Sequence, residues 1–200
     1  YRLVQSDAEL EKLCGSVHHQ GVVAMIEEPR IVAVTMEWIK RWETEKSAVL
    51  LCDRIGNANN LGAIIRSAAF FGIEHIVISG DDAQAQLTPS AYRIAQGGME
   101  FITLYTTPSA EHFLKMCSGY LVRIGADHRA YRSLKDIPSV VQPDEAAVVV
   151  LGNEEHGISA EAKKLCDVLV KISGSGAIES LNVAQAGTLF CSALAELRRE

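Results

Sequence analysis

Short runs of apolar and β-branched residues are the feature of this 200-residue chain that most constrains its fold. Each run is about as long as one strand, and several are apolar at consecutive positions instead of at every second one. Strands with this pattern are buried on both faces, as in a parallel sheet that is covered by helices. The runs are Ala48–Cys52, Ile76–Ile78, Phe101–Tyr105, Tyr120–Ile124, Ala147–Leu151 and Val168–Ile172.

Amphipathic segments of helical length lie between these runs, at Leu61–Phe71, Pro108–Cys117, Ser159–Cys166 and Leu181–Leu197. Alternation of strands and helices is typical of an α/β domain built on a mainly parallel sheet flanked by helices. We predict this fold class for residues 47–200.

The first 46 residues follow a different pattern. Residues 1–14 look helical, residues 21–26 look strand-like, and a charged stretch follows. We interpret residues 1–30 as the tail of an upstream domain, part of which we expect to be missing because the sequence begins at Tyr1. Residues 31–46 are interpreted as a linker.

The composition excludes several classes of protein. With 48% hydrophobic and 22% charged residues the chain is not mainly disordered, and no apolar segment reaches the length of a membrane span. The five cysteines are scattered and have no C-x-x-C spacing, which favours neither a disulfide framework nor a zinc site. We expect a cytoplasmic protein with no metal and no membrane partner.

The charge pattern leaves the question of nucleic acid open. A net charge of −6 disfavours RNA or DNA as a partner, because binding to them is driven largely by phosphate neutralisation. Two clusters of basic residues run against this overall charge, and each is either a solvated surface or an RNA contact. They are Arg123, His128, Arg129, Arg132 and Lys135, and Lys40, Arg41 and Lys46.

Open parallel sheets bind ligands beyond the carboxyl ends of their strands, so we examined the loops that follow the strand-like runs. In the loop after Cys52, Asn60 stands where it would cap a helix, and Arg66 lies inside that helix. Two interpretations are open. Asn60 is a helix cap and Arg66 an ordinary surface residue, or the planar guanidinium of Arg66 is directed at a phosphate group.

The other two loops contain glycines next to polar side chains. After Leu151, Gly152 and Gly157 bracket Glu154 and permit close backbone approach or a positive φ. After Ile172, Ser180 and Asn182 stand at the start of a long apolar helix, which Ser180 could cap.

Several common catalytic and nucleotide-binding motifs are missing from the sequence. Gly174-Ser175-Gly176 lacks the third glycine of a dinucleotide fingerprint, and there is no G-x-x-x-x-G-K-[ST] phosphate loop. A G-x-S-x-G nucleophile elbow is also absent. The sequence therefore disfavours dinucleotide and nucleoside-triphosphate cofactors, and it lacks the central turn of a serine hydrolase.

Taken together and in this order, the three loops resemble the three motifs of the SpoU/TrmH family of RNA ribose methyltransferases. The resemblance covers residues 47–200 and more weakly residues 17–22, which are similar to the end of a small upstream RNA-binding domain. Its motifs are Asn60-Leu61-Gly62-Ala63-Ile64-Ile65-Arg66-Ser67-Ala68, Gly152-Asn153-Glu154-Glu155-His156-Gly157, and Ser180-Leu181-Asn182-Val183 with Ile172 and Gly176 upstream.

The resemblance implies an α/β domain with a deep C-terminal trefoil knot, working as a homodimer. It implies S-adenosylmethionine as cofactor and the ribose 2′-hydroxyl of a structured RNA, tRNA or rRNA, as methyl acceptor. The polar catalytic and structural set that it implies is Asn60, Arg66, Glu154, Ser180 and Asn182. The residues that it places around the cofactor, largely through their backbone, are Gly152, Ile172 and Leu181.

The sequence departs from the family pattern at one place. The family usually has Ile-Pro after the last strand, where this chain has Ile172-Ser173-Gly174. Loss of the proline ring is expected to loosen the loop and weaken cofactor binding. Because the five polar positions are intact we favour a working enzyme. The alternatives are a non-catalytic RNA-binding or ribosome-assembly protein that retains the fold, and a dimerisation module.

Overall fold

The computed structural model describes residues 1–17, 19–27, 29–80 and 84–198, and it divides the chain into two compact units. The first unit, Tyr1–Arg30, contains helix α1 (Asp7–Cys14), which ends at Gly15 in the left-handed region. Residues 21–26, which we expected to be strand-like, form no strand, so that expectation is wrong. Val22, Met25 and Ile26 in this segment are largely exposed.

The second unit, Ile31–Glu200, is built on one sheet, which has eight strands among the described residues. The strands are β1 (Val32–Ala33), β2 (Ala48–Asp53), β3 (His75–Ser79), β4 (Thr103–Thr107), β5 (Val122–Ala126), β6 (Arg132–Ser133), β7 (Ala147–Gly152) and β8 (Val168–Lys171). Their order is β1-β4-β3-β2-β7-β5-β8-β6, and every pairing is parallel. The predicted parallel sheet is confirmed.

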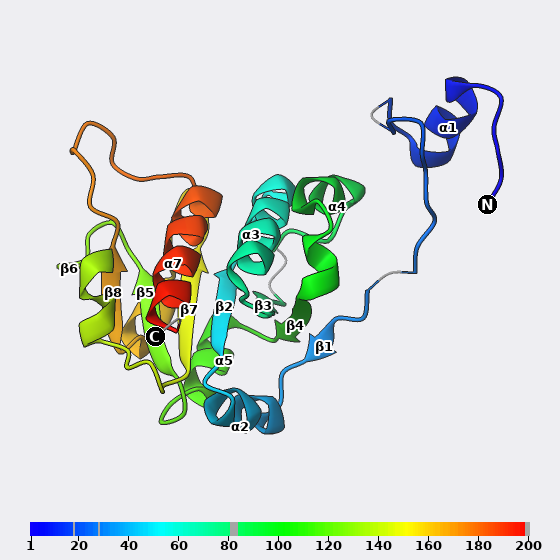
Figure 1. The fold of residues 1–200 in the computed structure, drawn as a ribbon. Helices are drawn as coiled ribbons and strands as arrows, with labels where there is room; N and C mark the ends of the chain where they lie inside the picture. The colour runs from blue at the N-terminus through cyan, green and yellow to red at the C-terminus, as the bar shows by residue number, and fades with distance from the viewer. Residues whose placement is uncertain (18, 28, 81–83, 199–200) are drawn as a thin grey trace. The chain divides into compact units, whose positions relative to one another are not determined.

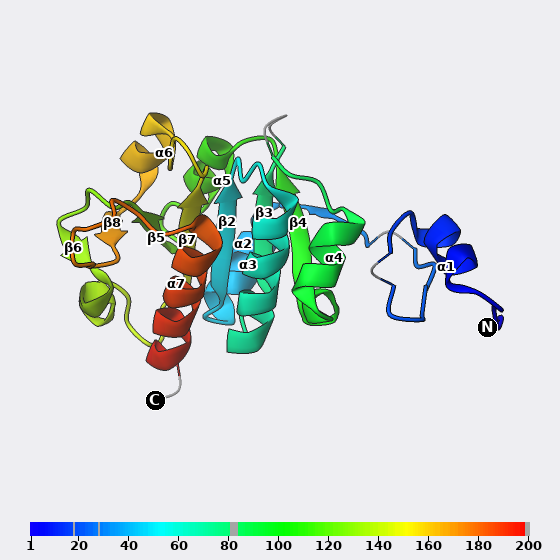
Figure 2. The same ribbon diagram turned by 90° about the horizontal axis from the view of Figure 1, so that it is seen from above.

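Helices cover both faces of the sheet, as Figures 1 and 2 show. The helical elements of the second unit are α2 (Met36–Thr44), α3 (Ala58–Phe71), α4 (Pro89–Ala95), η1 (Gly98–Phe101), α5 (Ala110–Met116), η2 (Leu134–Ser139), α6 (Ala160–Leu165) and α7 (Val183–Leu197). Helices α3, α4 and α7 lie on one face, and α2, α5 and α6 lie on the other. This is the α/β architecture expected from the alternating pattern.

Two hydrophobic cores lie on the two faces of the sheet. In β2, Leu50 and Cys52 belong to the core beneath α3 and α7, whereas Val49 and Leu51 belong to the core beneath α2 and α5. Successive side chains of a strand point to opposite faces, so a strand with a helix layer on each side must be apolar at every position. This explains why the central strands read as unbroken apolar runs.

Residues 31–46, which we expected to be a linker, fold as β1 and α2 of the second unit. Ile39 and Trp42 of α2 are completely buried, and the Trp42 ring meets Tyr105 of β4 edge-on at a centroid distance of 5.0 Å. The charged residues of this stretch lie on the exposed side of an amphipathic helix. Its few apolar side chains contribute directly to the core.

Candidate active site

The polar loops singled out in the sequence follow β2, β7 and β8, and they lie at the same edge of the sheet (Figure 1). Strands β2 and β7 are direct neighbours whose last residues, Asp53 and Gly152, are paired in register. Strand β8 follows after β5 in the strand order. All strands are parallel, so their carboxyl ends meet at one edge, where ligands of open α/β sheets bind.

In the first loop, Asn57 caps α3, and the prediction that Asn60 is the cap is wrong. The Asn57 side chain accepts the Asn59 N–H at 2.8 Å, and the helix begins at Ala58. The cap is displaced because α3 starts three residues earlier than the apolar pattern indicated. Asn60 therefore lies inside the first turn, where its side chain is available for contacts with other loops.

Glu154 of the second loop is bound to the first loop by three hydrogen bonds. Its carboxylate accepts the Asn60 side-chain N–H at 2.8 Å and the backbone N–H groups of Gly56 and Asn57 at 3.0 and 3.1 Å. Partial burial alone would raise the pKa of Glu154, but the hydrogen bonds from Asn60 and Gly56 outweigh it and hold the pKa below its ordinary value. Glu154 is therefore ionised and fixed in place.

Asn182 extends this set of hydrogen bonds into the third loop. Its side-chain N–H donates to the Asn60 side-chain oxygen at 3.0 Å. Its own side-chain oxygen accepts the Ala184 N–H at 2.8 Å and caps α7. Glu154, Asn60 and Asn182 thus form one continuous chain of hydrogen bonds, which we call the loop triad, and it joins all three loops.

Ser180 does not belong to the loop triad. Its side chain is exposed and forms no hydrogen bond with any residue that the structure describes. Asn182, two residues further on, caps α7 instead. The capping role considered for Ser180 is therefore wrong, and its catalytic role stays a prediction.

Position 152 must be glycine because the backbone of the following turn lies too close to it for any side chain. A Cβ at this position would overlap with the backbone of Gly157 and Ile158. The turn is closed by reciprocal backbone hydrogen bonds between Asn153 and Gly157, and Gly157 has a φ of 66°. Of the two reasons considered for glycine, close approach applies to Gly152 and positive φ applies to Gly157.

The third loop leaves its backbone polar groups available to a ligand. Residues 173–181 are exposed and form no backbone–backbone hydrogen bond with any described residue. At its two ends, Ile172 is half-buried and Leu181 is 48% exposed. A loop with open N–H and C=O groups between two apolar side chains can bind a flat, hydrogen-bonding ring system such as adenine.

Arg66 lies apart from the loop triad. It is exposed, and it forms no ion pair or hydrogen bond within the part of the chain that the structure describes. Being six residues after Asn60 on α3, it projects about 9 Å further along the helix axis and about 120° around it. Its Cα lies next to Gly98 of η1, away from Asn60 and Glu154.

Asp53 is a residue of this edge that the sequence did not single out. It is 2% exposed, and its carboxylate accepts the Ser159 N–H and the Arg54 side-chain N–H, both at 3.1 Å. Ser159 caps α6 by accepting the Ala162 N–H. Asp53 therefore connects the end of β2 to the start of α6. Its position directly after the apolar run Ala48–Cys52 is the sequence feature by which it could have been predicted.

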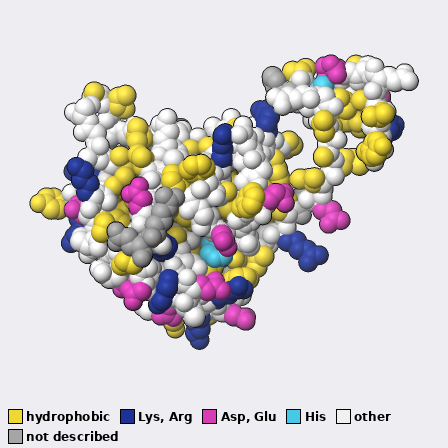
Figure 3. Space-filling model, viewed as in Figure 1, with side chains coloured by type: hydrophobic (Ala, Val, Ile, Leu, Met, Phe, Trp, Pro, Cys, Tyr) yellow, Lys and Arg dark blue, Asp and Glu magenta, His cyan; other side chains and the backbone are white. Residues whose placement is uncertain are grey.

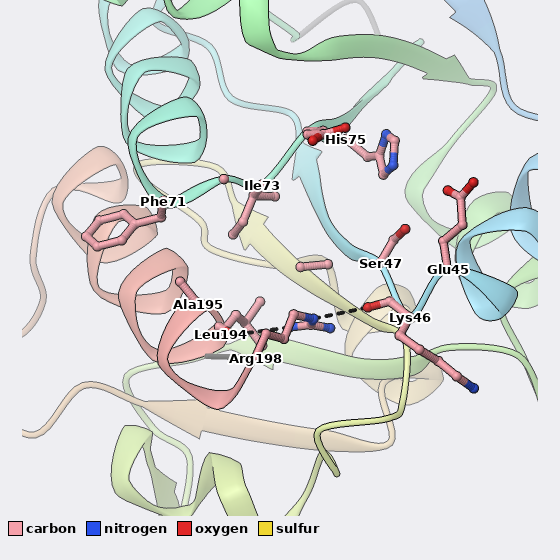
Figure 4. Close-up of a pocket in the computed structure, with 12 residues that line it drawn as sticks. Glu45, Lys46, Ser47, Phe71, Ile73, His75, Leu194, Ala195 and Arg198 are labelled. Atoms are coloured by element: carbon pink, nitrogen blue, oxygen red, sulfur yellow. Dashed lines mark hydrogen bonds between the residues drawn. The ribbon is translucent and has the colours of Figure 1, made fainter. Parts of the chain in front are cut away.

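Two hollows lie at the opposite edge, where the strands begin. One, of about 590 Å³, is lined by the first residues of β5, β7 and β8. The other, of about 450 Å³, lies between the starts of β2 and β3 and the end of α7 (Figure 4). There the Arg198 guanidinium donates to the carbonyl oxygens of Lys46, Glu145 and Leu194. These hydrogen bonds connect the end of α7 to the segments before β2 and β7, which indicates a structural role for Arg198.

Three further features concern membranes, metal ions and cysteines. No helix of the described residues is long and apolar enough to cross a membrane. The same residues contain no group of three or more His, Cys, Asp or Glu side chains that could hold a metal ion. The five cysteines are free thiols, of which Cys52, Cys117 and Cys191 are buried.

Comparison with known proteins identifies the family. Residues 47–192 match the model of the SpoU rRNA Methylase family, and this match spans all three loops. The chain belongs to the SpoU methylase family.

Relatives of this SpoU-family chain include enzymes named for a specific reaction. It is 31% identical over 182 residues to the 23S rRNA (guanosine-2'-O-)-methyltransferase RlmB of Nitrosomonas europaea, with 88% of this chain and 67% of the relative covered. It is 30% identical to RlmB of Neisseria meningitidis, over 100% of this chain and 77% of that one.

Solved structures agree with this assignment. A TrmH-family RNA methyltransferase from Porphyromonas gingivalis superimposes with a TM-score of 0.68 at 29% identity, over 77% of this chain and 60% of that one. The SpoU methyltransferase AviRb from Streptomyces viridochromogenes, in complex with AdoMet, has a TM-score of 0.67 at 25% identity, over 78% of this chain and 59% of that one. The chain thus spans about three fifths of both solved relatives.

Proposed function

We propose that this SpoU-family domain transfers a methyl group from S-adenosylmethionine to a ribose 2′-hydroxyl of rRNA or tRNA. The observation that carries the proposal is the loop triad. Glu154, Asn60 and Asn182 come from three different loops, and their hydrogen bonds of 2.8 and 3.0 Å hold those loops at one edge of the sheet. The names of the RlmB relatives support rRNA as the substrate.

The residues at this edge fit S-adenosylmethionine. Gly152, Ile172 and Leu181 would surround it, and backbone groups of residues 173–181, which form no backbone–backbone hydrogen bond with any described residue, would bind the adenine edge. When bound, the cofactor supplies an electrophilic methyl group on sulfur. The protein's part is to hold the ribose hydroxyl in line with that group, and such positioning can account for much of the rate. Glu154 and Asn60 would keep the loops in this geometry. Ser180 and Asn182 would fix the position of the loop that binds the cofactor.

Arg66 is proposed to grip the RNA phosphate and ribose and to stabilise the developing oxyanion. A guanidinium has too high a pKa to be a comfortable base, so we leave the proton acceptor open. Because Arg66 projects away from the loop triad of its own chain, it would act on a second copy.

We therefore propose a homodimer whose interface includes α7 and the neighbouring face of α3. Phe70 on α3 is 80% exposed and Leu189 on α7 is 40% exposed, and the two helices are joined by a 2.7 Å hydrogen bond between Ser67 and Thr188. A second copy covering these apolar side chains would place Arg66 within the interface. A monomeric mass in light scattering at micromolar concentration would contradict this proposal.

The strand order supports a trefoil knot, which we also propose. Strand β8 lies between β5 and β6 and pairs with both. Strands β5 and β6 are joined only by residues 127–131, and Ala126 and Arg132 both lie beside Val170 of β8. This link must therefore cross one face of β8, and we propose that the chain that leaves β8 passes beneath the link.

Residues 1–30 are proposed to be the tail of an upstream RNA-binding domain. The alignment with RlmB of Neisseria meningitidis runs through 100% of this chain, which includes them. We propose that the protein works in the cytoplasm, where thiols such as its five free cysteines stay reduced.

The test is methyl transfer from radiolabelled S-adenosylmethionine to rRNA and tRNA of a strain that lacks the gene, using the full-length protein. We expect label on ribose, recovered in an alkali-resistant dinucleotide. If the protein binds RNA but neither binds the cofactor nor transfers label, it is the non-catalytic RNA-binding protein considered above. The departure at Ser173-Gly174 would then be the first feature to examine.

A further inference from the structure

The link between β5 and β6 carries a fully exposed aromatic side chain. Tyr131 is 98% exposed, against 80% for Phe70 and 70% for Phe101. An isolated aromatic residue at a protein surface is ordinary, so its neighbours decide what it can do. Here the neighbours are Arg129, Arg132 and Lys135, all exposed. We call Arg129, Tyr131, Arg132 and Lys135 the basic link.

Two of the three cations of the basic link, Arg132 and Lys135, are not paired with the carboxylates around it. Asp127 forms an ion pair with Lys163 of α6 at 2.8 Å, and Asp136 accepts the Ser133 N–H at 2.7 Å. Arg132 and Lys135 form no ion pair with any carboxylate that the structure describes. Figure 3 shows Lys and Arg side chains at this end of the molecule, around β6 and β8. The surface is therefore locally positive in a chain whose net charge is −6.

The basic link lies directly beside the third loop of the candidate active site. Glu179 of that loop lies 3.1 Å from the His128 ring nitrogen and forms an ion pair with Arg129 at 3.7 Å. The Asp127 N–H donates to the carbonyl oxygen of Val170, at the end of β8, at 3.0 Å. A ligand on the basic link would thus lie next to the loop that is proposed to hold the cofactor.

We propose that the basic link binds a single-stranded stretch of the RNA substrate beside the target nucleotide, with the Tyr131 ring stacked on an unpaired base. Arg132 and Lys135 would bind the phosphates on either side. This rests on the RNA methyltransferase function proposed above. A projecting ring between cations fits single-stranded RNA, since the bases of a duplex are already stacked on one another and are closed to side chains.

The experiment measures RNA affinity in the full chain with a short pyrimidine oligoribonucleotide, either single-stranded or annealed to its complement. Tyr131→Ala is expected to raise Kd for the single strand about tenfold, as is usual for loss of one stacking ring, and to leave the duplex unchanged. Tyr131→Phe retains the π-face and should bind like wild type. Arg132→Gln should lower the slope of log Kd against log salt by about 0.7, the value for one phosphate contact.

The matched controls are Phe101→Ala, which removes another exposed aromatic ring, and Arg93→Gln, which removes a charge on α4. Both should leave RNA affinity unchanged. The proposal is overturned if Tyr131→Ala binds the single strand as wild type does. It is also overturned if that variant loses affinity for S-adenosylmethionine, or changes the oligomeric mass, because the ring then serves the cofactor loop or an interface between copies.

Failure of this proposal can be told apart from failure of the proposed function. If wild type methylates RNA and Tyr131→Ala retains full single-strand affinity, the enzyme assignment stands and the proposed RNA-binding role of the basic link is wrong. If wild type transfers no methyl group but Tyr131→Ala still weakens single-strand binding about tenfold, the basic link stands and the enzyme assignment falls.

Discussion

The two edges of the sheet differ in what their polar groups do. At the amino edge lie hollows of about 450 and 590 Å³, and the Arg198 guanidinium there donates to three backbone carbonyl oxygens. At the carboxyl edge three loops are tied together by Glu154, Asn60 and Asn182, while the backbone of residues 173–181 is left open. The open backbone groups in this fixed frame are the reason for proposing the ligand site at the carboxyl edge.

The largest effect is expected for Arg66→Ala. If Arg66 grips RNA and stabilises charge during transfer, methylation should fall about 10²–10³-fold or more. Cofactor affinity and the melting temperature should stay nearly unchanged, because Arg66 has no partner within the described part of its own chain. Transfer of radiolabelled methyl groups and calorimetry with S-adenosylmethionine check the two halves of this prediction.

Arg66→Lys keeps the charge but loses the bidentate fork, and it should restore little activity. Full activity in Arg66→Ala would remove Arg66 from the mechanism. The assignment of the carboxyl edge would survive on the other two loops.

Glu154→Gln should have the next largest effect, because an amide cannot accept the three hydrogen bonds that reach this carboxylate. We expect cofactor affinity to fall about 10-fold or more and the free energy of unfolding to fall by about 1–3 kcal/mol. Urea denaturation and calorimetry measure the two quantities.

Glu155→Gln is the matched control for this change. The Glu155 side chain is 85% exposed, and its carboxylate lies 4.0 Å from the His156 ring nitrogen. It should change neither quantity. Equal effects of the two substitutions would mean that the loop triad does not hold the site together.

Arg198→Ala tests the amino edge and should separate stability from function. Loss of the hydrogen bonds from this charged group to three backbone carbonyl oxygens is expected to lower the free energy of unfolding by about 1–3 kcal/mol. Cofactor affinity and kcat/KM of the folded protein should not change. A cofactor affinity that fell with this variant would reassign the ligand to the amino edge.

The pH dependence of stability should distinguish Glu154 further. Its pKa is held below the ordinary value of 4.5 in the folded protein, so its contribution to stability is complete above that value. The contribution is lost as the pH falls through the lower, folded-state pKa. The difference in unfolding free energy between wild type and Glu154→Gln should therefore be constant above pH 6 and shrink below pH 4.5. A difference that grew on acidification would contradict the direction of this shift.

The smallest expected effect is a gain of cofactor affinity in Ser173→Pro. The proline ring would restrict the exposed loop before binding and reduce the entropy lost on ordering it, which is worth about 0.4–1 kcal/mol, or about two- to fivefold in Kd. Calorimetry is sensitive enough to detect such a change. Weaker binding in Ser173→Pro would mean that the loop needs a backbone conformation that proline cannot adopt.

Much of the fold followed from the sequence because the central strands are buried on both faces. The runs around Leu50 and Val149 have no polar residue to obscure them, and both were predicted as strands of a mainly parallel sheet. Elements that are short, or that mix apolar with charged residues, were missed. Helix α2 buries Ile39 and Trp42 within a stretch of charged residues, β6 has only two residues, and α4 is a short helix.

The site was predicted in part for a similar reason. The residues of the loop triad stand in local motifs, so Asn60, Glu154 and Asn182 could be named individually. Their mutual contacts span 94 and 122 positions of the sequence, and no local pattern carries that information. Asn57 was missed as the cap of α3 because the first turn of that helix contains polar residues. Its apolar periodicity starts only at Leu61.

The central claim, that the cofactor binds at the carboxyl edge, is tested most directly by titrating S-adenosylmethionine into isotope-labelled protein and following the backbone amide resonances. The account predicts that the largest shifts, and new protection from hydrogen exchange, fall on residues 152–158 and 172–182. The amides around Lys46, His75 and Arg198 should not move. Shifts concentrated at those amino-edge residues, or no shifts at millimolar cofactor, would contradict it.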